Sequence, residues 1–194
     1  MKRIRIGFSI CGSFCTIANV IKQIELLKNK NYDFLPIMTE NAIKTDTKFG
    51  KAKDIVKKIE KISSKKVLTK IEEVEPIGPK NLTDLMLVAP CTSNTLSKLT
   101  NGIVDNAVTL AVKSHLRETK PVLVAFASND ALGTSAKNLG VLLNTKNFYF
   151  VPLSQDDPKN KPNSLVAHFE LIEPSIKLAL KRKQIQPIFY KKFC

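Results

Sequence analysis

A run of small polar residues follows the most apolar segment of this 194-residue sequence. The apolar segment reads LMLVA at positions 85–89, and after it come Pro90, Thr92, Ser93, Asn94 and Thr95. Hydroxyl and amide groups at the start of a helix, together with the free N–H groups of its first turn, can bind an anion or a planar heterocycle. These five residues are therefore candidate binding residues for a cofactor or a substrate.

A second candidate for anion binding is the pair Gly12 and Ser13, which follows the strand-like segment 4–10. At the start of a helix this pair can present backbone N–H groups and a hydroxyl to one phosphate group. The alternative is an ordinary turn in which Ser13 caps the helix. The spacing Gly7-x4-Gly12 lacks the Lys-Ser/Thr pair of an ATPase loop, and no G-x-G-x-x-G fingerprint follows. Neither ATP hydrolysis nor NAD(P) binding in the usual manner is therefore expected of this chain.

Five other residues have side chains capable of chemistry. Asn129 and Asp130 follow an apolar segment and can orient a ring nitrogen or a carboxylic acid of a substrate, or they can cap the next helix. His115 lies on the apolar stripe of an expected helix, which favours a buried or interface histidine over a catalytic one. Asp156 and Asp157 precede a proline in a polar stretch, which favours a turn or a contact between subunits. No residue is assigned a catalytic role.

Composition argues against several classes of function. The 31 Lys and Arg residues and 17 Asp and Glu residues give a net charge of +14, which attracts anions of any kind. The lysines cluster between apolar positions of helical patterns, and no nucleic-acid-binding motif is present, so solvated helix faces are favoured over a nucleic-acid site. The cysteines have no metal-ligand spacing, so we expect no metal site and small buried side chains at Cys11, Cys15, Cys91 and Cys194.

Strand-like and helical patterns alternate along the chain. Strands are expected at 4–10, 34–38, 66–68, 85–89, 121–126 and 148–151. Helices are expected at 17–27, 52–62, 93–99, 106–116 and 131–143, with a last one beginning near Ser164 after a polar loop at 155–163. Pro90 is expected to end the strand before it.

This alternation predicts a three-layer α/β/α domain, doubly wound and Rossmann-like, with a mainly parallel six-stranded sheet. The length favours one domain over residues 1–194, with a loosely ordered tail from about 186 to 194. In such sheets, ligands bind beyond the carboxyl ends of the strands, where the strand order reverses. No apolar run of about 18 residues is present, so no membrane partner and a cytoplasmic protein are expected.

The run from Pro90 to Thr95, followed by Lys98 and by NGIVDN at 101–106, resembles two motifs of the flavin-containing cysteine decarboxylase superfamily. Those motifs are Pro-Ala-Ser-Ala-Asn-Thr and Asn-Gly-Ile-Ala-Asp-Asn. The resemblance implies a flavoprotein-type fold and FMN bound at the interface between copies in trimers, some of which assemble further into dodecamers. It implies that Gly12, Ser13 and Thr39 lie on the phosphate side of the FMN.

The same resemblance implies that Asp105 is a carboxylate on the cofactor or substrate side, with a cap for the helix from Asn106 as the alternative. The chain also departs from the superfamily. It has no histidine between the second strand and Pro90, it has no tryptophan, and AFASNDAL at 125–132 replaces the substrate clamp of the decarboxylases. Cysteine decarboxylation is therefore not expected.

A narrower resemblance covers about 180 residues of the chain. Several segments are similar to the family of dipicolinate synthase B subunits, among them TDTKFG at 45–50, EPIGPK at 75–80, SNDALG at 128–133 and QDDP at 155–158. The resemblance implies an oxidoreductase component that works with the A subunit of dipicolinate synthase, or with another oxidoreductase partner, to oxidise dihydrodipicolinate to dipicolinate in the mother cell of a spore-forming bacterium.

In that interpretation NADP binds to the partner, and the ligand of this chain is a small pyridine dicarboxylate. A dianion of this kind suits a basic domain with helix N-termini facing its cleft. Two alternatives remain open at this point. One is a non-catalytic scaffold protein that binds FMN or another ligand, and the other is an enzyme similar to flavin prenyltransferases.

Overall fold

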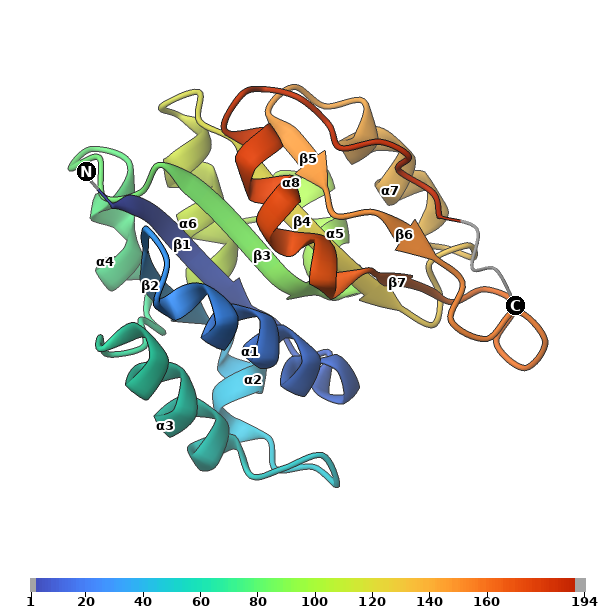
Figure 1. The fold of residues 1–194 in the computed structure, drawn as a ribbon, viewed down its shortest axis with the longest axis horizontal. Helices are drawn as coiled ribbons and strands as arrows, with labels where there is room; N and C mark the ends of the chain where they lie inside the picture. The colour runs from blue at the N-terminus through green and yellow to red at the C-terminus, as the bar shows by residue number, and fades with distance from the viewer. Residues whose placement is uncertain (1–2, 191–194) are drawn as a thin grey trace.

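A parallel sheet forms the centre of the molecule (Figure 1). The computed structural model describes residues 3–190. Its five parallel strands lie side by side in the order β2-β1-β3-β4-β5. Their bounds are Ile4–Ile10 for β1, Tyr32–Met38 for β2, Leu85–Cys91 for β3, Val122–Ser128 for β4 and Phe148–Phe150 for β5. The strand order reverses between β1 and β3, where ligands of such sheets are expected to bind.

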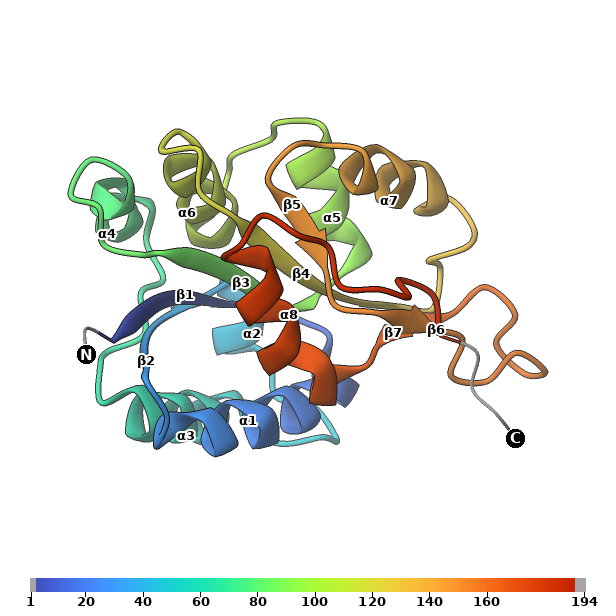
Figure 2. The same ribbon diagram turned by 45° about the horizontal axis from the view of Figure 1, so that its top comes forward.

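Helices cover both faces of the sheet, so the three-layer α/β fold is confirmed (Figures 1 and 2). One face carries α1 (Phe14–Lys28), α3 (Ala52–Ser63) and α8 (Ile172–Ala179). The other face carries α4 (Ile71–Val74), α5 (Ser93–Thr100), α6 (Ala107–Leu116) and α7 (Ala136–Leu143). The short helix α2 (Glu40–Lys44) follows β2, and 3₁₀ turns occupy Glu75–Ile77 and Phe169–Leu171.

The central strands are buried on both faces. All seven residues of β3 and the first six of β4 are buried, as expected for apolar runs that do not alternate with polar residues. Pro90 does not end β3, because the strand continues to Cys91. The carboxyl end of β3 is therefore part of the rigid sheet.

The predicted count of six strands is wrong, because residues 3–190 form a mixed sheet of seven strands. Two short strands, β6 (Leu153–Ser154) and β7 (Leu165–Ala167), pair antiparallel with each other, and β7 pairs with the last two residues of β4. The segment 66–68 is not a strand and forms only a single bridge from Leu68 to Ile37.

Two predicted helices begin later than expected. The segment after Ser164 is strand β7, and helical structure starts only at Phe169. The helix predicted over 131–143 begins at Ala136, because the Asp130 carboxylate holds the preceding residues in a turn by accepting bonds from the Thr134 N–H and the Ser135 hydroxyl, at 3.3 and 3.1 Å. The predicted loose tail from about 186 lies partly outside the described residues, which end at 190.

The Gln184 side chain closes the outer edge of β5. Its Oε1 accepts a hydrogen bond from the Phe150 N–H at 2.8 Å, and its Nε2 donates to the Phe150 carbonyl at 2.8 Å. The amide thus pairs with both backbone groups of Phe150, as a neighbouring strand would. We expect Gln184→Ala to lower the free energy of unfolding by about 2 kcal/mol. Chemical denaturation measures this, and Gln186→Ala, which removes an exposed amide bonded only to Ile188 N, is the control.

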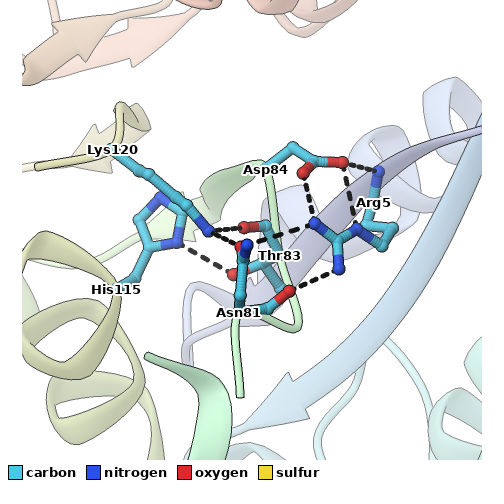
Figure 3. Close-up of polar contacts among 6 residues, drawn as sticks. All are labelled: Arg5, Asn81, Thr83, Asp84, His115 and Lys120. Atoms are coloured by element: carbon cyan, nitrogen blue, oxygen red, sulfur yellow. Dashed lines mark hydrogen bonds and ion pairs between the residues drawn. The ribbon is translucent and has the colours of Figure 1, made fainter. Parts of the chain in front are cut away.

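A polar cluster lies at the amino ends of the central strands (Figure 3), at the edge of the sheet opposite the carboxyl ends where ligands are expected. The predicted burial of His115 is confirmed, with 1% of the residue exposed. Its Nε2 donates to the Pro121 carbonyl at 3.0 Å, and its Nδ1 therefore accepts from the Thr83 hydroxyl at 2.8 Å. Burial lowers the pKa of His115 to about 4. The ring is thus a neutral link between the starts of β3 and β4.

Arg5 and Asp84 form the outer part of this cluster (Figure 3). The guanidinium donates from Nη2 to Asp84 Oδ1 at 2.5 Å and from Nε to Oδ2 at 3.2 Å. Burial raises the pKa of Asp84, but the bonds from Arg5 outweigh it and lower the pKa overall. The neighbouring Lys120 ammonium donates to the Thr83 carbonyl at 2.6 Å. The cluster ties the amino ends of β1, β3 and β4 together.

Candidate functional site

A hollow of about 380 Å³ lies beyond the carboxyl ends of β1, β2 and β3. Its position is the one expected from the reversal of strand order. Its volume falls at the lower end of the range of about 300–1,000 Å³ typical of ligand pockets. The residues that line it are Gly12, Phe14, Thr39, Glu40, Asn41, Thr92, Asn94, Thr95, Lys98, Asp105 and Asn106.

Backbone hydrogen bonds join the three strand ends beneath the hollow. The Thr39 N–H, directly after β2, donates to the Ile10 carbonyl at 3.1 Å, and the Cys11 N–H donates to the Pro90 carbonyl at 3.2 Å. The turns that carry Gly12, Thr39 and Asn94 therefore converge on one rim of the sheet. Pro90 itself is buried in β3 and contributes this carbonyl instead of lining the hollow.

The N-termini of α1, α5 and α6 all meet the hollow. The Thr92 hydroxyl caps α5 by accepting from the Thr95 N–H at 3.3 Å, and the Asn106 carbonyl oxygen caps α6 by accepting from the Thr109 N–H at 3.1 Å. Ser13 occupies the N-cap position of α1, as its alternative predicts, but its side chain makes no capping hydrogen bond. Each helix N-terminus carries a partial positive charge, and three of them together favour an anion in the hollow.

Besides Pro90 and Ser13, three predicted site residues do not line the hollow. The Ser93 hydroxyl points toward the end of β4 and donates to the Ser128 hydroxyl at 2.5 Å. Asn129 is exposed and accepts a long bond of 3.5 Å from the Ser164 hydroxyl. Asp130 holds the turn before α7, which agrees with the alternative of a local structural role. The structure therefore separates these residues from the other candidates, and Ser13 stands beside the hollow without lining it.

Asp105 lines the hollow and does not cap α6, because Asn106 fills that position. Its Oδ2 accepts from the Lys98 ammonium at 2.6 Å, and its Oδ1 accepts from Asn106 Nδ2 at 2.8 Å. The hydrogen bond from Lys98 lowers the pKa of Asp105. The carboxylate is thus ionised at neutral pH.

Sequence reasoning missed five lining residues, namely Phe14, Glu40, Asn41, Lys98 and Asn106, of which the last two were noted only as parts of a motif. Glu40 and Asn41 belong to α2, whose five residues are too few to show a helical period in the sequence. The Lys44 ammonium donates to Glu40 and lowers the pKa of that carboxyl group. Part of the negative charge on this side of the hollow is therefore neutralised by a neighbour.

Two cysteines lie close to the hollow without lining it. Cys11 and Cys91 are buried, as predicted, whereas Cys15 is exposed and contradicts the prediction; Cys194 lies outside the described residues. Burial raises the pKa of the Cys11 thiol to about 11 and raises the pKa of Cys91 as well. Neither buried thiol is ionised at neutral pH, so neither is an activated nucleophile.

Within residues 3–190, no helix has the length and apolar character needed to cross a membrane.

Comparisons with known proteins identify the family of this chain. Residues 1–169 match the Flavoprotein family. The chain is 42% identical over 193 residues to the B subunit of dipicolinate synthase from Bacillus subtilis strain 168, which covers 100% of this chain and 96% of that protein. The crystal structure of the B subunit of dipicolinate synthase from Bacillus halodurans C superposes with a TM-score of 0.89 at 39% identity, covering 100% of both chains.

A more distant solved structure shares the fold. The dodecameric FMN-dependent UbiX-like decarboxylase from Escherichia coli superposes with a TM-score of 0.63 at 20% identity, covering 77% of this chain and 80% of that one. The family match and the full-length similarity together decide the assignment. The chain belongs to the flavoprotein family and, within it, to the family of dipicolinate synthase B subunits.

Proposed function

We propose that the hollow binds FMN, with the phosphate held at the turn of Gly12 and Thr39. The observation that supports this most directly is the meeting of three helix N-termini in one hollow. The first turn of α1 has no side-chain cap, and since the Thr16 N–H donates to the Ser13 carbonyl, the N–H groups of Phe14 and Cys15 are the ones that would donate to phosphate oxygens. The hydroxyls of Thr39 and Thr92 add donors of the neutral kind that fix the orientation of a ligand.

The residues present fit this group in size and chemistry only if a second surface completes the site. A volume of about 380 Å³ accommodates the phosphate and part of the remainder of FMN. The isoalloxazine ring would then extend beyond this chain. A homo-oligomer built from trimers, with the flavin between neighbouring copies, follows as part of the proposal. One domain spanning residues 1–194 would supply each copy.

For the reaction, we assign the chain the role of one component of a two-component oxidoreductase. Oxidation of dihydrodipicolinate to dipicolinate removes a hydride and a proton from the dihydropyridine ring, and the hydride passes to NADP bound by the partner. FMN, when bound, would supply a ring that can accept and return electrons. Because aromatisation favours the oxidation, this chain's residues would chiefly bind and orient the reactants. The setting is the cytoplasm of the mother cell during sporulation.

A non-catalytic scaffold is the second candidate. Among the described residues that line the hollow there is no histidine and no cysteine, and the two carboxylates there are each paired with a lysine. No group is thus placed to transfer a proton near neutral pH. The same hollow would then bind its ligand to shape or regulate the partner's active site.

Purified protein distinguishes the two candidates. We expect the full-length protein to bind FMN with the absorbance of an oxidised flavin, and co-expression with its partner to yield NADP-dependent formation of dipicolinate. A colourless protein that takes up no added FMN, while dipicolinate still forms with the partner, would favour the scaffold. Loss of dipicolinate formation on omission of this chain is the control for its involvement.

A further inference from the structure

Lys98 is the only cation among the described residues that line the hollow. It lies in the last turn of α5, and its side chain is 23% exposed. It also lines a second hollow of about 500 Å³, whose walls include the apolar Ile103 and Val104 together with the cations Lys113 and Arg117. Lys98 therefore stands where the two hollows adjoin. A ligand that reaches from one into the other passes its ammonium group.

Lys98 is paired with Asp105, which competes with any anionic ligand for the ammonium group. Lys98 Nζ lies 2.6 Å from Asp105 Oδ2, and the turn between them is closed by the bond from the Ile103 N–H to the Lys98 carbonyl at 2.9 Å. The Asp105 carboxylate is ionised and faces the same hollow as the three helix N-termini. A ligand carboxylate that approaches Lys98 must displace this like-charged group.

Displacement costs little because the carboxylate of the pair is accessible to water. The Asp105 side chain is 49% exposed, and ion pairs of this kind contribute little to stability because water screens them. After displacement, Asp105 keeps its bond from Asn106 Nδ2 and its access to water. The ammonium gains a ligand carboxylate next to the apolar wall of the second hollow, where the charge is screened less.

We infer that the Lys98 ammonium binds a second anionic group of the ligand and so selects for ligands that carry one. Asp105 holds the Lys98 side chain in place until the ligand binds. The inference rests on the proposed function, because it assumes that the hollow binds a small planar dicarboxylate beside the flavin. It assigns to Lys98 the carboxylate that lies at the junction of the two hollows. Asp105 then weakens binding of the ligand, although it lines the site.

The opposite signs expected for the two residues provide the test. The affinity of the purified full-length protein for pyridine-2,6-dicarboxylate is measured by titration calorimetry. We expect Lys98→Met to weaken binding by roughly tenfold or more and Asp105→Asn to strengthen it by roughly fivefold. Lys98→Arg retains most of the affinity. Lys137→Met, which removes an exposed lysine on α7, leaves it unchanged.

A monocarboxylate separates recognition from a structural effect. The preference for pyridine-2,6-dicarboxylate over pyridine-2-carboxylate should disappear in Lys98→Met, and Asp105→Asn should strengthen binding less in the Lys98→Met background than in the wild-type protein. No binding by the wild-type protein, or weaker binding by Asp105→Asn, would overturn the inference. FMN uptake is measured on the same preparations. If the protein does not bind FMN but the variants change the affinity for the dicarboxylate as expected, the proposed function is wrong and the inference about Lys98 stands.

Discussion

A tryptophan in place of Asn94 is expected to abolish uptake of FMN by the purified protein. Asn94 is exposed in the first turn of α5 and lines the hollow, so an indole there would fill space that the ligand needs. By keeping the ligand out of place, the indole would cost the phosphate its charge-assisted hydrogen bonds at the turn of Gly12 and Thr39, worth about 3 kcal/mol or roughly a hundredfold in affinity. Titration with FMN, followed by flavin fluorescence, measures the effect.

Two further variants serve as comparisons for the FMN affinity of Asn94→Trp. Asn94→Ala removes the amide without filling the hollow, so a smaller loss of affinity is expected. Asn144→Trp places the same indole at an exposed position that does not line the hollow, and it should bind FMN like the wild-type protein. If Asn94→Trp takes up FMN with unchanged affinity, the flavin binds elsewhere and the proposed site is wrong.

Mild acid is expected to destabilise the fold through His115. An unfolded histidine has a pKa near 6.5, whereas burial lowers the pKa of His115 to about 4 in the folded chain. Between these values the unfolded state binds the extra proton, so stability falls as the pH falls. From pH 7 to pH 5 the loss is about 2 kcal/mol from this residue alone. Urea denaturation at a series of pH values measures it.

The variant His115→Asn removes the titrating ring and should flatten this pH dependence, although the loss of the link between Thr83 and Pro121 lowers stability at every pH. Lys137→Met, which removes an exposed lysine and leaves His115 in place, should keep the slope. Carboxylates with lowered pKa values, such as Asp84, lose their stabilisation only as the pH falls below the unfolded pKa near 4, toward the lower folded value. An unchanged slope in His115→Asn would contradict the assignment.

The sequence predicts the centre of this fold well because burial leaves a clear pattern. The strands around positions 85–89 and 121–126 are unbroken apolar runs, and both lie in the middle of the sheet. The edge is predicted poorly. Strands β6 and β7 have two and three residues; β7 is held by pairing with β4 and β6 by pairing with β7, contacts that no local sequence pattern reveals.

The candidate site is predicted in part for a similar reason. Gly12, Thr92, Asn94 and Thr95 come directly after strands, and the carboxyl ends of parallel strands share one edge of the sheet. The same rule suggested Asn129 and Asp130 after β4, but β7 pairs with the end of that strand and occupies the place next to it. Which strand ends reach the hollow depends on this pairing, so it could not be inferred from the order of elements.

The bonds from Cys11 N to Pro90 O and from Thr39 N to Ile10 O have a consequence for motion. They extend the ladder of the central sheet across the floor of the hollow, so these two amides are protected from hydrogen exchange until the sheet itself opens. The floor therefore keeps its shape whether or not a ligand is present. Adaptation to different ligands is left to side chains on the rim, which can reorient on the nanosecond timescale without disturbing the backbone.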